Sequence, residues 1–147
     1  MDMRFNEVFY DFTDDVPFVV FDDNQGRSFF IKITPHTAAD ILNYLNNSKK
    51  QFGQGFYNIF VDIFNCSDMK ITGLKITEYS EEGYKGYLEV DKDDRKFCYY
   101  LTGDDIILFS IMFDKPVKVS KNIFFDFKPE QVKSPLSEIF LDAKFEN

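Results

Sequence analysis

The chain has 147 residues, of which 44% are hydrophobic and 18% aromatic, so it is long enough for one domain with a real core and too short for two ordinary domains. Its net charge of −8 disfavours binding to the phosphate backbone of a nucleic acid. It has no apolar stretch of about 18 residues and no secretory signal at its start, so we expect a cytoplasmic protein without a membrane span.

Three stretches near the N-terminus have patterns typical of β-strands. Residues 7–13 alternate in character, residues 18–21 form an apolar run, and residues 28–33 follow the polar turn 22–26. Asp, Asn and Gly in that turn are residues that hairpins favour. The pattern therefore predicts two strands and a hairpin into a third.

The third predicted strand leads into Thr34-Pro35, where we expect a helix to begin. Thr is a good N-cap, and Pro suits the first helical position because its missing N–H would have no partner there. The helix is predicted to reach about Leu45, before the polar, glycine-bearing loop 46–55. A second helix is predicted from an apolar stripe at helical spacing, which we expect to face the core: Phe56, Ile59, Phe60, Ile63 and Phe64.

The second half of the chain repeats the change from strands to helix. Residues 74–90 alternate around a turn and predict a hairpin, and residues 96–101 predict a further strand. A helix is predicted from Thr102 onward, followed by a last strand at 116–119. An apolar stripe within residues 134–145 predicts a short C-terminal helix.

The two halves contain one unit twice. Segments 29–46 and 98–114 share the order apolar strand, Thr, break residue and helical apolar run. Aligning Thr34 with Thr102 matches pairs that are all 68 positions apart. We therefore predict an α+β fold in which internally duplicated strand–helix units share an antiparallel or mixed sheet. We expect all 147 residues to form a single domain, with a core at about 19–125 and a helical extension at 134–145.

The cysteine and histidine pattern provides no recognisable metal cluster. Cys66 and Cys98 form no C-x-x-C pair, and His36 is the only histidine. Such a pattern gives neither a disulfide framework nor a zinc site. We expect both cysteines to be small buried residues.

The element order and two linked motifs resemble the bifunctional nuclease domain family of bacteria and plants. Residues 102–108 read TGDDIIL, where the family has R-P-S-D-A-I, and residues 115–119 read KPVKV, where it has G-A-P-I-F-V. Asp105 and Pro116 keep the family's spacing of eleven residues. The resemblance covers roughly residues 19–125 and implies metal-dependent hydrolysis of DNA or RNA.

The chain departs from the family pattern at several places. The family's I-G-x-x-E-A reads ITPHTA here, so Thr37 replaces the acid, and its T-H-D triplet reads FVD, which keeps only Asp62. A nuclease of this kind holds a divalent ion such as Mg²⁺ with carboxylates, and the ion activates water. The residues that the resemblance implies for this role are Asp104, Asp105 and Asp62, with His36 as a base.

Asp105 also has a structural interpretation. If Thr102 is the N-cap, Asp105 occupies position N3, where a short acid interacts favourably with the helix dipole and the free N–H groups. We favour this role, because the equivalent position of the first unit holds Thr37 and not an acid. His36, beside a proline in the first helical turn, is expected to be exposed.

Two classes of function therefore remain open. One is a metal-dependent nuclease, and the other is a non-catalytic interaction or regulatory module that keeps the fold. Nineteen Phe residues and an amphipathic C-terminal helix also predict a homodimer or larger assembly. We expect residues 122–127 and the final helix to form its interface.

Overall fold

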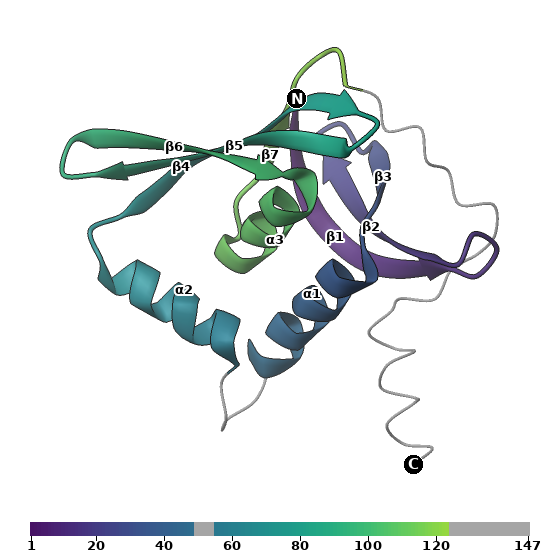
Figure 1. Ribbon diagram of the computed structural model, residues 1–147, viewed down its shortest axis with the longest axis horizontal. Helices are drawn as coiled ribbons and strands as arrows, with labels where there is room; N and C mark the ends of the chain where they lie inside the picture. The colour runs from purple at the N-terminus through teal and green to yellow at the C-terminus, as the bar shows by residue number, and fades with distance from the viewer. Residues whose placement is uncertain (49–54, 124–147) are drawn as a thin grey trace.

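A seven-stranded mixed sheet curves over three helices in the part of the chain that the computed structural model describes, residues 1–48 and 55–123 (Figure 1). The strands follow the order β3-β2-β1-β7-β4-β5-β6 across the sheet. This arrangement confirms the predicted single α+β domain.

Two three-stranded meanders, each followed by a helix, make up most of the fold. The first unit contains β1 (Asp2–Asp11), β2 (Val16–Asp23), β3 (Ser28–Lys32) and α1 (Pro35–Ser48). The second contains β4 (Lys70–Ser80), β5 (Gly83–Lys92), β6 (Arg95–Thr102) and α3 (Gly103–Phe113). The first strand and the helix of the second unit each begin 68 positions after those of the first. The duplication therefore covers whole meanders, and not only the strand–helix joints that the sequence indicated.

The short strand β7 (Val117–Val119) joins the two units. It pairs antiparallel with β1 and parallel with β4, so it lies between the two meanders and leaves β3 and β6 at the edges. The backbone N–H of Val119 donates to the carbonyl of Met1 at 2.8 Å. A segment that follows the second unit in sequence thus completes the sheet between both units.

The hairpin turns contain residues suited to a left-handed backbone. Asp93 and Asp94, between β5 and β6, have φ values of 51° and 62°. Positive φ at both central residues defines the type I′ turn, whose twist matches that of the flanking strands. The acidic run between these strands is therefore a hairpin turn.

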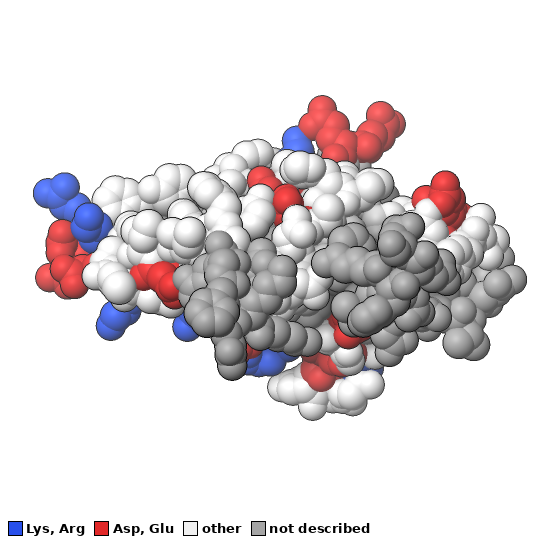
Figure 2. All heavy atoms as spheres, turned by 90° about the horizontal axis from the view of Figure 1, so that it is seen from below, with Lys and Arg blue, Asp and Glu red and all other residues white. Residues whose placement is uncertain are grey.

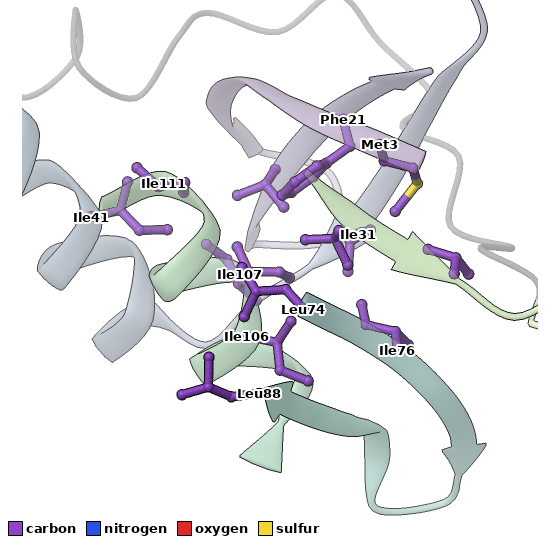
Figure 3. Packing of buried hydrophobic residues seen from close by; sticks show 14 of the residues in the cluster. Met3, Phe21, Ile31, Ile41, Leu74, Ile76, Leu88, Ile106, Ile107 and Ile111 are labelled. Atoms are coloured by element: carbon purple, nitrogen blue, oxygen red, sulfur yellow. The ribbon is translucent and has the colours of Figure 1, made fainter. Parts of the chain in front are cut away.

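The core fills the space between the curved sheet and α3. Its largest buried side chains come from both units and point toward one another (Figure 3): Met3, Phe21, Ile31, Ile76, Ile106 and Ile107. Gly86 of β5 lies so close to α3 that an added Cβ would come within 2.8 Å of the Ile106 Cδ1 atom. Helix α3 therefore occupies the sheet surface directly.

Helix α2 (Phe56–Cys66) lies outside this layer and packs on α1 and α3 (Figure 1). Its buried residues are Asn58 and Phe64. The expectation that the apolar stripe faces the core is wrong for most of its members, since Phe56 is 77% exposed and Ile63 is 66% exposed. The reason is that α3 already covers the sheet, so α2 can bury only the side that meets the other two helices.

Several other expectations can be compared with the structure. The first strand begins at Asp2, earlier than predicted, and α1 continues through residues 46–48 of the expected loop. Both cysteines are exposed free thiols, not buried residues, because Cys66 ends α2 and Cys98 lies on edge strand β6. The rest of the loop, 49–54, and the C-terminal helix, 134–145, lie outside the described residues.

Within residues 1–48 and 55–123, no helix is both long enough and apolar enough for a membrane span.

Candidate functional site

The two strand–helix joints have the same N-cap geometry. The Thr102 hydroxyl oxygen accepts a hydrogen bond from the backbone N–H of Asp105 at 3.3 Å. In the first unit, the Thr34 hydroxyl oxygen accepts from the backbone N–H of Thr37 at 3.2 Å. Each bond satisfies one of the free donors in a first helical turn. The predicted N-cap at Thr102 is therefore confirmed, and Asp105 occupies position N3.

The Asp104 carboxylate connects the two joints. Its Oδ2 atom accepts hydrogen bonds from the backbone N–H of Thr34 at 3.0 Å and from the Thr37 hydroxyl at 2.8 Å. The Thr37 hydroxyl also accepts from the Thr34 hydroxyl at 3.0 Å. Thr37 is 7% exposed, so the hydroxyl that donates to Asp104 is shielded from water. Asp104 thus joins residues about 70 positions apart, and it does so through one of its two carboxylate oxygens.

Helices α1 and α3 run side by side in the same direction. Asp104 connects their first turns, and at the other end the Tyr44 hydroxyl donates to the Met112 carbonyl at 2.9 Å. Two parallel helices bring their partial positive charges together at the N-termini. The Asp104 carboxylate lies where it interacts favourably with both helix ends. The bonds that Asp104 accepts therefore give this residue a structural role that requires no catalytic function.

Asp105 lies in a second small group of polar side chains with Asp40 and Tyr57. Burial raises the pKa of the Tyr57 hydroxyl, and its hydrogen bond to the Asp40 carboxylate and the nearby charges of Asp40 and Asp105 raise it further. The Asp105 side chain itself is exposed. An exposed carboxylate beside a tyrosine and a second acid can bind a polar ligand, but it is only one strong ligand for a metal ion.

His36 lies at the outer edge of this group, and Asp62 lies away from it. The His36 side chain is 87% exposed and forms an ion pair with Asp40 at 3.4 Å, as expected for a residue on the outer face of α1. Burial raises the pKa of the Tyr44 hydroxyl, and the charge of Asp62 adds to the effect. Since Tyr44 contacts the last turn of α3, Asp62 acts at the opposite end of that helix from Asp104.

The four residues proposed from sequence do not form a metal site. Across the described parts of the chain, no three His, Cys, Asp or Glu side chains lie close enough together to hold a metal ion. Asp104 and Asp105 are adjacent, while His36 points to solvent and Asp62 lies at the far end of α3. These four residues therefore do not come together as one set of metal ligands in the described parts of the chain.

Sequence reasoning missed three residues of this region, Thr37, Asp40 and Tyr57. Asp40 had a local signal, because it follows His36 by four positions on the same helix face. In the sequence, Thr37 stands only where the family has an acid, whereas in the structure its hydroxyl donates a hydrogen bond to Asp104, an acid of the other unit. Tyr57 had no local signal, because only the packing of α2 brings it to Asp40.

Comparisons with known proteins add no relative. No protein-family model matches the chain, and no curated protein matches it. The resemblance to the bifunctional nuclease domain family therefore rests on the motifs of this chain alone.

Proposed function

We propose that this chain is a domain of the bifunctional nuclease type that works by binding another protein and not by cutting nucleic acid. The observation that carries the proposal is the pair of hydrogen bonds received by the Asp104 carboxylate from Thr34 and Thr37. A carboxylate oxygen that accepts two bonds inside the fold is not free for a metal ion. The most conspicuous acid of the motif thus holds the two units together.

The charge of the chain supports the same proposal. The net charge is −8, and helices α1, α2 and α3 contain Asp40, Asp62, Asp104 and Asp105 but no Lys or Arg. A phosphate backbone would be repelled from this helical side of the domain. A protein partner with cationic side chains would be attracted to it.

The exposed apolar residues of α2 supply a reason to expect a protein partner. Phe56, Ile59, Phe60 and Ile63 form one stripe on the helix, and each is at least 37% exposed. Isolated exposed apolar residues are ordinary, whereas a contiguous set is typical of an interaction surface.

A metal-dependent nuclease remains the second candidate, because one observation favours it. The Asp105 carboxylate is exposed and lies near Tyr57 and Asp40, so this acid is open to a ligand. On this alternative, Asp105 would contact the substrate or a bound ion, and the cap at Thr102 would position it.

A cleavage assay separates the two candidates. We would incubate the full chain with single-stranded DNA and RNA in the presence of Mg²⁺ or Mn²⁺, with chelator-treated samples as blanks. We expect no cleavage above the blanks. Metal-dependent cleavage that disappears in Asp105→Asn but persists in Glu81→Gln, an acid of the distant β4–β5 turn, would overturn the proposal in favour of the nuclease.

The proposal extends to compartment and assembly. Two exposed free thiols suit a reducing compartment, which supports a cytoplasmic location. The large number of phenylalanines supports a homo-oligomer. Most of the interface expected for it, residues 124–127 and the C-terminal helix, lies outside the described residues.

A further inference from the structure

We propose that the exposed face of α2 is the docking site for a cationic amphipathic helix of a partner protein. This inference rests on the proposed binding function and adds the surface and the chemistry of the partner. We call the residues Phe56, Ile59, Phe60 and Ile63 the α2 stripe. The inference depends on the shape of the stripe, on strand β6 at the edge of the same sheet and on the charge of the helical layer.

The spacing of the α2 stripe is suited to a second helix. Its residues stand at i, i+3, i+4 and i+7, so they form a continuous row about 10 Å long at the helical rise of 1.5 Å per residue. Such a row is the usual contact surface for an amphipathic helix, whose own apolar residues repeat at the same spacing. The row is held against helix α3, because the ring of Phe60 lies 6.3 Å from that of Phe109 and 6.2 Å from that of Phe113.

Strand β6 contributes exposed aromatic side chains on the same side of the sheet. Phe97 lies opposite the buried Val90, and Tyr99 lies opposite the buried Leu88. Residues directly opposite each other in an antiparallel pair point to the same face, here the face that carries α3. Phe97 is 40% exposed and Tyr99 is 51% exposed. A partner on the α2 stripe therefore has further apolar side chains within the same helical side of the domain.

The charge of the helical layer selects the partner. The three helices carry only Asp among their Asp, Glu, Lys and Arg residues. Figure 2 shows this side from below, with broad uncharged areas between carboxylates, and Lys and Arg mainly toward the end where the β5–β6 turn lies. The negative potential of these Asp residues would not attract an anionic or neutral partner helix. A second copy of this chain would bring the same carboxylates and a further −8 of net charge. A partner helix with Lys or Arg beside its apolar face is complementary both to the carboxylates of the helices and to the α2 stripe.

Binding of designed peptides to the full chain tests the inference directly. The probe is a fluorescent amphipathic peptide of about 14 residues made of Leu and Lys, long enough for about four helical turns. One matched peptide has Glu in place of every Lys, and another has the same Leu and Lys in a scrambled, non-amphipathic order. By anisotropy, we expect the Lys peptide to bind at least about tenfold more tightly than either control, which corresponds to about 1.4 kcal/mol. We expect the difference to shrink at high salt.

Matched substitutions locate the binding surface. Ile63→Lys removes an apolar contact and adds a repelling charge within the α2 stripe, and we expect it to weaken the Lys peptide by about tenfold or more. Phe12→Lys makes the same kind of change at a 63% exposed residue in the β1–β2 turn, and we expect it to change affinity by less than about twofold. Both residues are largely exposed, and equal melting temperatures would show that both variants fold.

Three other results would overturn the inference. Equal weakening by the two substitutions would mean that the peptide binds by net charge alone, and equal binding of the Glu peptide would remove the electrostatic argument. A dimer in sedimentation that Ile63→Lys disperses and Phe12→Lys does not would mean that a second copy covers the stripe. Cleavage that depends on Asp105 would refute the proposed function, while the peptide affinities would still be measurable by themselves.

Discussion

Replacing Asp104 with Ala should destabilise the domain, because it removes the connection between the two repeat units. The change eliminates the bonds from the Thr34 N–H at 3.0 Å and from the Thr37 hydroxyl at 2.8 Å. Hydrogen bonds to a charged group contribute about 1.5–3 kcal/mol each in favourable cases. Thr34 is exposed and can bond to water, whereas the buried Thr37 hydroxyl loses its acceptor. We therefore expect a loss of about 2 kcal/mol, close to the contribution of the Thr37 bond alone and below the sum for two such bonds.

Urea denaturation measures this loss. For a small domain, stability falls by about 1–3 kcal/mol per molar urea, so the midpoint of Asp104→Ala should lie about 1 M below that of the parent. Asp104→Asn keeps a neutral acceptor and should lose about half as much. Neither substitution should change the slope of the transition, because neither changes the surface buried on folding.

A double-mutant cycle with Thr37→Val tests whether the two side chains interact. If the bond at 2.8 Å stabilises the fold, the combined loss should be smaller than the sum of the single losses by about 1 kcal/mol. Additive losses would refute the reasoning. A loss below about 0.5 kcal/mol for Asp104→Ala would do so as well, since that is typical of an ordinary surface position.

Four further predictions concern the rest of the fold. Asp105→Asn should cost on the order of 0.5–1 kcal/mol in urea denaturation and leave any cleavage activity nearly intact, as expected for an acid at a helix N-terminus. Gly86→Ala should cost more than about 3 kcal/mol, because its Cβ would meet the backbone carbonyl of Lys75; a near-parental melting temperature would contradict this. Burial raises the pKa of Asp23, but the hydrogen bonds and the charge of Arg27 outweigh this effect and hold the pKa below its usual value. The stabilisation that the Asp23 carboxylate provides is therefore present above the usual carboxyl pKa of 3.8 and is lost as pH falls through the lowered pKa. Between about pH 6 and about pH 3, Asp23→Asn should therefore lose less stability than the parent, and an equal loss would contradict the assignment. Sedimentation at high micromolar concentration should detect a dimer or larger species that Ile63→Lys leaves intact, whereas a strictly monomeric species would refute the predicted assembly.

Local signals allowed most elements to be predicted from the sequence. Thr34 and Thr102 define the starts of α1 and α3 because an N-cap hydroxyl bonds to a backbone N–H only three residues later. Alternation of apolar residues determined the meanders because successive side chains on a strand point to opposite faces. The repeat at 68 positions then indicated two similar units before any contact between them was known.

The candidate site could not be predicted in the same way. The sequence places Asp104 and Asp105 side by side in one motif, which makes both look like ligands for one ion. The structure separates their roles, since Asp104 bonds to the first unit while the exposed Asp105 carboxylate lies near Tyr57. Contacts between residues about 70 positions apart leave no mark in local spacing, so a motif cannot distinguish a carboxylate that holds two helices from one that binds a metal.

The sequence by itself determined which segments are strands and helices, where α1 and α3 begin and that one unit occurs twice, because each depends on residues within a few positions of one another. Only the tertiary structure decided which side of an apolar helix is buried. Helix α2 has one apolar stripe, and its periodicity predicted burial of a side that is in fact largely exposed. The outcome depends on the surface left to it: α3 occupies the sheet, so α2 buries Asn58 and Phe64 and presents Phe56 and Ile63 to solvent.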